Sequence, residues 1–327
     1  MLNNLLNIIK FQKFADKFSQ KHVLVVGDLM LDSYMWGTAS RISQEAPVPV
    51  VSVEHITHNP GGAANVGWNL SSLSAKVSMA GVVGRDIQGN QLLNIISEKG
   101  INIDGIAKEE NRDTTVKTRV IAQGQQVVRT DMESLKPIKT DSDEFIVNYI
   151  SLVLSEVDGI ILADYNKGLL SKNLIHRILN LASRQNLPVY VDPKTDNFYE
   201  YQNTRLFKPN SIEFTESTGH DIDLKTVNEL RKTLNVEHLL ITIGAEGMLL
   251  VANDSEFKIP TKARAVHDVS GAGDTVISVY TLADLAGASP KEAATIANLA
   301  AGRVCEEVGV VPIDLEMLQE IINHHHS

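Results

Sequence analysis

Short, uninterrupted apolar runs recur along the chain and form its most regular pattern. The first, Lys21–Gly27 (KHVLVVG), is rich in β-branched residues and ends at a glycine. Similar runs lie at Ala75–Val83, Gly159–Ala163, Pro188–Val191 and His238–Ile243. Segments that are apolar at nearly every position are typical of parallel strands with both faces buried, so we expect these runs to form the centre of a sheet.

Stretches with helical patterning separate the apolar runs. They are Gly62–Leu73, Asn90–Lys99, Asp141–Leu154 and Lys172–Arg184. The C-terminal part of the chain is mostly helical, with segments at Asp274–Ala286, Pro290–Val308 and Ile313–Asn323. Strands that alternate with helices in this way predict an α/β domain with a largely parallel sheet.

Two segments depart from this rhythm, Ser33–His58 and Thr114–Thr130. Both alternate apolar with polar residues, and Gly124 divides the second into two halves, which indicates antiparallel strands exposed on one face. We expect them to form one small sheet, called the lid below (about 33–58 and 114–130). Because so small a sheet buries little by itself, it is suited to covering a ligand or forming an oligomer interface. No long linker divides the chain, so we expect one domain, 1–327.

Composition narrows the classes of partner. The 327 residues are 43% hydrophobic and 21% charged, with a net charge of −10. A general nucleic-acid binder needs a basic face, so we expect no nucleic-acid partner. No apolar run approaches the ~20 residues that cross a bilayer, so we expect no membrane partner either.

The single cysteine, Cys305, excludes an intrachain disulfide and favours a reducing, cytoplasmic location. Its place in an apolar helical run predicts a small buried residue rather than a nucleophile. The N-terminal MLNNLLNIIKFQKFADKF is patterned as an amphipathic helix and lacks the cleavage site of a signal peptide. We assign no metal role to the terminal HHHS.

The motif DVSGAGDT (Asp268–Thr275) combines a glycine-rich turn with a carboxylate. Gly271 and Gly273 permit close backbone approach to a ligand, and a helix begins at Asp274, so its free N–H groups can bind an anion. The alternative is an ordinary turn with an aspartate cap. These residues alone leave both interpretations open.

NPGGAAN (Asn59–Asn65) places a diglycine before a helix, with Asn65 in the first turns, where its amide can reach a polyol hydroxyl. The alternative is a tight turn. In KPNSIE, Asn210 and Glu213 lie three residues apart and could share a hydrated cation, although the same spacing also suits a helix capping box. TIGAEG (Thr242–Gly247) suits nucleotide contacts or a hairpin turn.

Acidic and basic residues follow two predicted strands. ADYNKG (Ala163–Gly168) ends one strand and Asp192-Pro-Lys194 ends the next. Open α/β sheets bind ligands beyond the carboxyl ends of their strands, so these residues indicate a site there, with surface salt bridges as the alternative. The turn after VLVVG lacks GxGxxG, which argues against a Rossmann dehydrogenase.

Together the motifs resemble the ribokinase, or PfkB, family of sugar kinases over nearly the whole chain. The matching segments, in family order, are VVGDLMLD, PGGAANV, GVVGRDIQG, ADYNKG, VDPK, KPNSIE, TIGAEG, DVSGAGDT and ANLAAG. The resemblance implies a ribokinase-like three-layer α/β/α domain with a mostly parallel central sheet and a small β-sheet lid. Asn166 stands where a glycine is usual, and Ser270 where threonine is common; Asn tolerates the left-handed conformation.

Within the family, GDLMLDSYMWGTASRISQEAPVPVV followed by NPGGAANV is similar to the kinases of D-glycero-D-manno-heptose 7-phosphate. This resemblance implies ATP-dependent phosphorylation at C1, giving heptose 1,7-bisphosphate for ADP-heptose and lipopolysaccharide core synthesis. The alternatives are a family kinase acting on fructose or tagatose phosphate, and a non-catalytic sugar- or nucleotide-binding regulator. Asp274 argues against the regulator, because a binder needs no base.

The resemblance also implies roles for individual residues. Asp274 would be the general base, and the N–H groups of Gly271, Ala272 and Gly273 would stabilise the transferred phosphoryl group. Glu213 and Asn210 would organise Mg²⁺ through water. ATP would contact Lys194, Thr242, Gly244, Gly247 and Asn298.

For the sugar, the resemblance implies hydroxyl contacts from Asp32, Gly61, Gly62 and Asn65. The substrate phosphate would be bound by Lys117, Arg119, Arg129 or Lys167, which the sequence does not rank. Asp268 and Ser270 would help to hold a monovalent cation, as in some relatives. A homodimer through the lid is expected.

Overall fold

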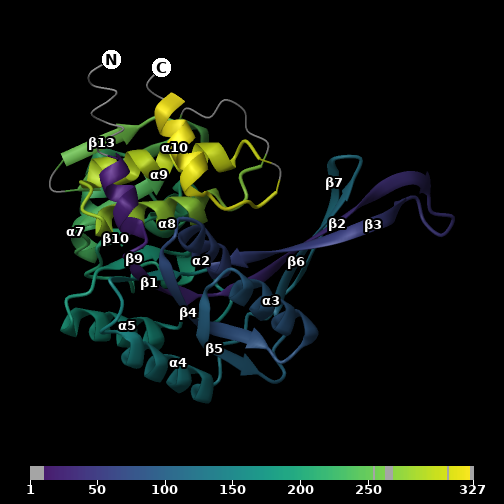
Figure 1. Cartoon of the computed structure of the whole chain (residues 1–327), viewed down its shortest axis with the longest axis horizontal. Helices are drawn as coiled ribbons and strands as arrows, with labels where there is room; N and C mark the ends of the chain where they lie inside the picture. The colour runs from purple at the N-terminus through teal and green to yellow at the C-terminus, as the bar shows by residue number, and fades with distance from the viewer. Residues whose placement is uncertain (1–10, 253–254, 262–267, 308, 325–327) are drawn as a thin grey trace.

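A nine-stranded sheet runs through the protein, whose computed structural model describes residues 11–252, 255–261, 268–307 and 309–324 (Figure 1). In spatial order the strands are β13 (Ser255–Ile259), β12 (Met248–Ala252), β11 (His238–Thr242), β10 (Leu206–Phe207), β9 (Val189–Asp192), β8 (Gly159–Ala163), β1 (His22–Gly27), β4 (Lys76–Gly84) and β5 (Asn102–Glu109). Each neighbouring pair from β11 to β5 is parallel, and the β11–β12 and β12–β13 pairs are antiparallel. The five predicted strands are confirmed.

Helices cover both faces of the sheet. One layer holds α2 (Ala63–Ser72), α3 (Ile87–Glu98), α8 (Ala272–Leu285), α9 (Pro290–Val304) and α10 (Leu315–His324). The other holds α4 (Thr140–Val153), α5 (Lys172–Arg184), α6 (Ser211–Thr218) and α7 (Leu224–Leu234). Successive β1 residues alternate between the layers, since Val23 packs in the first core and Leu24 in the second. The predicted three-layer α/β/α architecture is confirmed.

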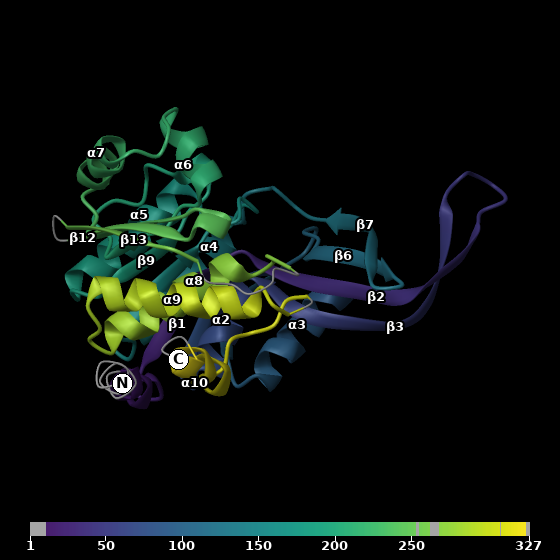
Figure 2. The same ribbon diagram turned by 90° about the horizontal axis from the view of Figure 1, so that it is seen from above.

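A second sheet of four strands projects from this body, as Figures 1 and 2 show. Its order is β3 (Pro49–Gly62), β2 (Leu29–Ile42), β6 (Thr115–Ala122) and β7 (Gln125–Met132). The β2–β3 and β6–β7 pairs are antiparallel, with Gly124 in the left-handed region at the second turn. The expectation of antiparallel pairing throughout was wrong for β2–β6, which is parallel. Strand β2 follows β1 and strand β6 follows β5. Because β1 and β5 run in the same direction in the main sheet, β2 and β6 leave it in the same direction.

Two further expectations need correction near Cys305. Helix α9 ends at Val304, before the predicted Val308, and the two acidic residues Glu306 and Glu307 that follow oppose the helix dipole. Cys305 is half-buried at this helix end instead of fully buried. Burial and Asp268 raise the pKa of its thiol, which disfavours the reactive thiolate, as predicted.

The described part of the N-terminal helix is amphipathic, as expected. Residues 11–18 are helical and bury Phe11, Phe14 and Phe18 against the first core. Of the terminal HHHS, residues 325–327 lie outside the described residues. Among the helices that the structure describes, none has the length and apolar character to cross a bilayer.

Candidate active site

A cavity of about 550 Å³ opens at the carboxyl edge of the main sheet. It is bounded by the loops after β8, β9, β10 and β11 and by the first turn of α8. The predicted residues that line it are Lys194, Asn210, Glu213, Thr242, Gly244, Gly247, Ala272, Gly273, Asp274 and Asn298. The structure therefore brings together all the residues assigned to ATP and the proposed base, as expected from the strand-end rule.

Asp274 lies in the first turn of α8 and is only 8% exposed. Its Oδ2 accepts a hydrogen bond of 2.7 Å from Asn65 Nδ2, and its Oδ1 accepts one from the Tyr165 hydroxyl. Burial raises the pKa of Asp274 to about 6, while the hydrogen bonds from Tyr165 and Asn65 act in the opposite direction. The carboxylate is thus held by two neutral donors and titrates just below neutral pH, which suits a general base.

The glycine turn before Asp274 has a geometric requirement. Gly271 has φ 81°, and a Cβ there would lie 2.8 Å from Asn65 Nδ2, the group that holds the carboxylate. Among the three predicted amides, Ala272 donates a long bond of 3.3 Å to Val269 O, whereas no described residue accepts the N–H of Gly271 or Gly273. Two free amides at a helix N-terminus form a site for an anion.

Two ion pairs, each between a lysine and a carboxylate, line the cavity. Lys208 Nζ lies 2.9 Å from Asp192 Oδ1, and Lys194 pairs with Glu213 Oε1. Burial raises the pKa of Asp192, and Lys208 opposes the shift. Both lysines therefore supply positive charge beside the cavity, and Lys208 compensates the buried charge of Asp192.

Asn210 and Glu213 form a capping box at the start of α6, the alternative that their spacing left open. Asn210 Oδ1 accepts from Glu213 N at 2.9 Å, and Glu213 Oε2 accepts from Asn210 N at 2.8 Å. Since Lys194 contacts the other oxygen of Glu213, this pair fits a cation only through water. The described residues contain no cluster of three or more acidic, histidine or cysteine side chains for a metal.

The β11–β12 hairpin forms another wall of the cavity, so the hairpin interpretation of TIGAEG is also confirmed. Thr242 pairs with Asn210 through an isolated bridge. Asn298 Nδ2 donates to Pro260 O at 2.9 Å, which fixes its side chain at the cavity wall. Ile212, Met248 and Val276 make part of this wall apolar.

Polar residues at the root of the lid lie on the other side of Asp274. Asp32 is buried and accepts a hydrogen bond of 2.5 Å from Arg119 Nη1. A Cβ on Gly61 would lie 2.4 Å from Asp32 Oδ2, so only glycine leaves room for this carboxylate. Gly62 is the N-cap of α2, and Asn65 in its first turns reaches Asp274. The four residues assigned to the sugar hydroxyls are therefore adjacent.

The four basic residues assigned to the substrate phosphate differ in their partners. Arg119 pairs with Asp32, Arg129 with Asp131 at 3.0 Å, and Lys167 with Glu133 at 2.8 Å. Lys117 makes no ion pair with any residue that the structure describes. It lies between Asp32 and Asp131 in register, and burial lowers its pKa. Lys117 is therefore the cation with most capacity to accept a new anion.

Asp268 and Ser270 lie before the glycine turn, where Asp268 Oδ1 accepts from Ser270 N at 2.8 Å. Residues 262–267, which precede them, are outside the described residues. The monovalent-cation site stays a prediction.

Sequence reasoning missed Tyr165, Lys208 and Asp28. Tyr165 lies inside ADYNKG, where the acidic and basic residues give the signal of a strand-end site and the tyrosine gives none of its own. Asp28 accepts from the backbone N–H groups of Tyr165, Lys167 and Leu169 at 2.9, 3.2 and 3.2 Å. It thereby holds the loop that carries Tyr165. Its position directly after the first strand was the available signal.

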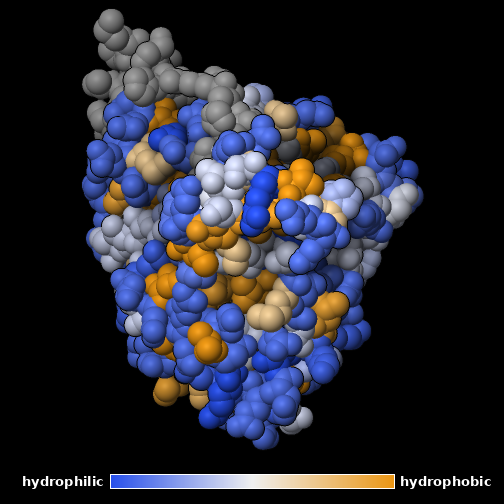
Figure 3. Space-filling model, turned by 90° about the vertical axis from the view of Figure 1, so that its right-hand side faces the viewer, coloured by the Kyte–Doolittle hydropathy of each residue, from blue (hydrophilic) through white to orange (hydrophobic). Residues whose placement is uncertain are grey.

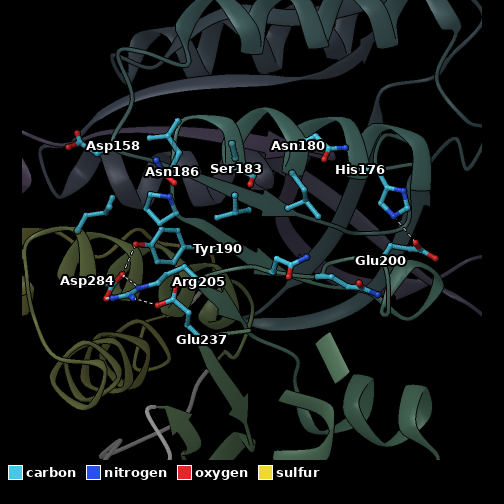
Figure 4. Close-up of a pocket in the computed structure, with 18 residues that line it drawn as sticks. Asp158, His176, Asn180, Ser183, Asn186, Tyr190, Glu200, Arg205, Glu237 and Asp284 are labelled. Carbon is cyan, nitrogen blue, oxygen red and sulfur yellow. Dashed lines mark hydrogen bonds and ion pairs between the residues drawn. The ribbon is translucent and has the colours of Figure 1, made fainter. Parts of the chain in front are cut away.

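A larger cleft, of about 960 Å³, lies at the opposite, amino edge of the sheet (Figure 4). Its labelled residues include Tyr190, Arg205, Glu237 and Asp284, which form a continuous network of hydrogen bonds and ion pairs. The described residues that line this cleft include no glycine, and its charged side chains have ion-pair or hydrogen-bond partners, such as Arg205 with Asp284 and His176 with Glu200. Its larger volume therefore does not make it the better candidate for catalysis.

Comparisons with known proteins place this chain among sugar kinases. Bifunctional protein HldE of Helicobacter pylori (strain J99) is 39% identical over 311 residues, which cover 94% of this chain and 67% of that protein. Phosphofructokinase-2 of Escherichia coli, solved with substrates and products, has a TM-score of 0.78 at 16% identity and covers 93% of this chain and 99% of its own. Ribokinase of Arabidopsis thaliana, solved with ribose and ATP, has a TM-score of 0.70 at 19% identity, covering 92% and 98%.

The two solved structures confirm a ribokinase-like fold. The description "pfkB family carbohydrate kinase" matches residues 20–316, which include every residue of the site described above. The chain is therefore a sugar kinase and belongs to the pfkB family of carbohydrate kinases.

Proposed function

We propose that this enzyme transfers the γ-phosphoryl group of ATP to the C1 hydroxyl of D-glycero-D-manno-heptose 7-phosphate. One observation carries the chemistry: Asp274 is buried, held by two neutral donors, and follows a turn with free amides. The carboxylate and the anion site are adjacent, yet they act on different atoms. The product would be heptose 1,7-bisphosphate, an intermediate for ADP-heptose and lipopolysaccharide core synthesis.

In this mechanism Asp274 accepts the proton of the C1 hydroxyl while its oxygen bonds to the γ-phosphorus. The bond between that phosphorus and the oxygen bridging to the β-phosphate breaks, and ADP leaves. The N–H groups of Gly271 and Gly273 bind the oxygens of the transferred group. Positioning and charge stabilisation contribute most of the catalysis in such reactions.

ATP would occupy the 550 Å³ cavity, with its base against the apolar wall and its phosphates toward Lys194 and Lys208. The Arabidopsis ribokinase, which shares this fold and was solved in complex with ATP, supports a nucleotide here. Glu213 and Asn210 would hold Mg²⁺ through water, and the ion would neutralise charge on the phosphates.

Support for the heptose comes from the sequence and its relatives. The segment from Gly27 through the diglycine resembles heptose-7-phosphate kinases, and the HldE match is at 39% identity, against 16% for phosphofructokinase-2. Fructose or tagatose phosphate is therefore disfavoured. We assign Lys117 as the first contact of the sugar's own phosphate, because Arg119, Arg129 and Lys167 already have carboxylate partners.

We also propose a cytoplasmic homodimer through the lid. One cross-strand row of the lid reads Ile56, Met35, Val120 and Val128, and it is apolar across all four strands. Ile56 and Val128 are 48% and 47% exposed. Figure 3 faces the side toward which the lid projects and shows apolar residues among hydrophilic ones. Covering such a face with a second copy would remove it from water.

ATP-consumption assays over a panel of sugar phosphates test the function. Heptose 7-phosphate should give the highest kcat/KM, with fructose 6-phosphate and tagatose 6-phosphate at least ~10²-fold lower. Equal turnover of the ketose phosphates would overturn the assignment of substrate. No turnover of any sugar phosphate would overturn the assignment of acceptor class.

A further inference from the structure

Three distant segments meet at the Asp274 carboxylate, and one of them contributes a phenol. Tyr165 follows β8, Asn65 lies in α2 and Asp274 begins α8, so the contacts span 109 and 209 residues of sequence. The Tyr165 hydroxyl donates to Oδ1 and the Asn65 amide to Oδ2. Each carboxylate oxygen retains one lone pair, which leaves room for the hydroxyl of a substrate.

The loop that carries Tyr165 is anchored through residues before and after it in the sequence. Asp28 accepts the backbone N–H of Tyr165 itself and of two later residues. The preceding Asp164 accepts from Asn166 N at 2.9 Å and from the Tyr201 hydroxyl at 2.6 Å. Lys194 Nζ lies 5.8 Å from the centre of the Tyr165 ring. Because these contacts hold the loop and the ring in place, the Tyr165 hydroxyl is kept within hydrogen-bond distance of the same oxygen of Asp274.

Ionisation separates the roles of the two groups. Burial and the adjacent Asp274 raise the pKa of Tyr165 well above its usual value, so the phenol keeps its proton throughout the neutral range. Its hydrogen bond favours the charged form of Asp274 against the effect of burial. Tyr165 therefore acts as a permanent donor and cannot itself serve as the base near neutral pH.

We propose that Tyr165 is the positioning residue of the base: its hydroxyl orients Asp274 and keeps it ionised for proton abstraction from the sugar. This inference rests on the proposed function. During the step, the sugar proton moves to Asp274, the sugar oxygen bonds to phosphorus, and ADP leaves. Tyr165 loses no proton and forms no covalent bond.

The test is Tyr165→Phe, with kcat/KM measured from pH 5 to pH 9 using ATP and heptose 7-phosphate. Loss of the hydrogen bond should move the acidic limb upward by about one pH unit and lower kcat by ~10-fold. The control is Tyr190→Phe, which removes the hydroxyl that contacts Asp284 at the other end of α8 and should leave the profile unchanged.

The ionisable groups that face Asp274 are Tyr165, Asp192, Lys194 and Lys208. Of these, Tyr165 shares a hydrogen bond with Asp274, so a shifted limb in Tyr165→Phe assigns that limb to Asp274. An acidic limb and kcat that overlay the parent's would overturn the inference.

A second measurement does not depend on the sugar. Thermal unfolding of Tyr165→Phe, Asp274→Asn and the double variant should give a coupling that is present at pH 7.5 and fades by pH 4, where the carboxylate is protonated. A coupling equal at both pH values would contradict the inference. Full activity of Asp274→Asn would instead overturn the assigned base, so the two failures are distinguishable.

Discussion

The two ends of helix α8 carry the same pair of side chains, an aspartate that accepts a hydrogen bond from a tyrosine. At the C-terminal end, Asp284 accepts from Tyr190 at 2.7 Å and is gripped by Arg205 through bonds of 2.9 and 2.8 Å. At the N-terminal end, Asp274 has Tyr165 and Asn65 but no ion pair with a described residue. The difference between the two aspartates is the presence of a direct cation.

This difference separates a structural carboxylate from a reactive one. The Arg205 guanidinium, which forms two hydrogen bonds with Asp284, compensates the buried charge of this aspartate and fixes the start of β10 to α8. Asp274 has no ion pair with a described residue, and burial raises its pKa to about 6, which allows it to accept and release a proton near neutrality. The same helix therefore anchors the sheet at one end and presents the base at the other.

The comparison predicts its largest effect on activity. Asp274→Asn should lower kcat by ~10³-fold or more, because an amide cannot accept the sugar proton. Asp284→Asn, the matched change at the other end of α8, should stay within about twofold of the parent. Steady-state kinetics at pH 8 and 20 °C checks both, and similar losses in the two variants would contradict the distinction.

The second effect is on stability, and here the larger loss is expected at the C-terminal end of α8. Arg205→Met should destabilise the fold by about 3–5 kcal/mol, because it leaves the 4%-exposed Asp284 without its cation. Adding Asp284→Asn to Arg205→Met should recover part of this loss. Urea unfolding measures each value. A loss below about 1 kcal/mol for Arg205→Met would show that the ion pair has no structural role.

The third effect is a gain in stability at the base. A carboxyl whose folded pKa exceeds its unfolded value of 3.8 favours folding only while protonated, so its contribution is lost as pH rises through about 6. Asp274→Asn removes this cost and should stabilise the fold by about 3 kcal/mol at pH 7.5. The gain should shrink steadily from pH 6 to pH 4. A constant gain across that range would refute a raised pKa.

The central strands of the main sheet could be predicted from the sequence. Runs such as Lys21–Gly27 are apolar at nearly every position because both faces of the strand are buried. The two-residue β10 was too short to give such a signal. The parallel pairing of β2 with β6 was missed because it depends on the positions and direction of β1 and β5, the strands of the main sheet that precede them. The loop residues of the cavity were found through glycines and strand ends, but the Tyr165–Asp274 contact links residues that no local pattern connects.

The smallest effect is expected in the lid, where Lys117 has no ion pair with a described residue and the other basic residues assigned to the substrate phosphate have carboxylate partners. Lys117→Met should raise KM for heptose 7-phosphate by ~10-fold and leave KM for ATP unchanged, because only the sugar's phosphate would lose a contact. Lys117→Arg should retain most of the affinity, since it keeps the charge.

The matched control for Lys117 is Arg129→Met on the neighbouring strand. Arg129 is half exposed and already bonded to Asp131, so its loss should change KM by about twofold or less. If Arg129→Met raised KM more than Lys117→Met, a paired cation would be the phosphate ligand. The presence of a carboxylate partner would then not distinguish structural charges from functional ones in the lid, although it could still do so along α8.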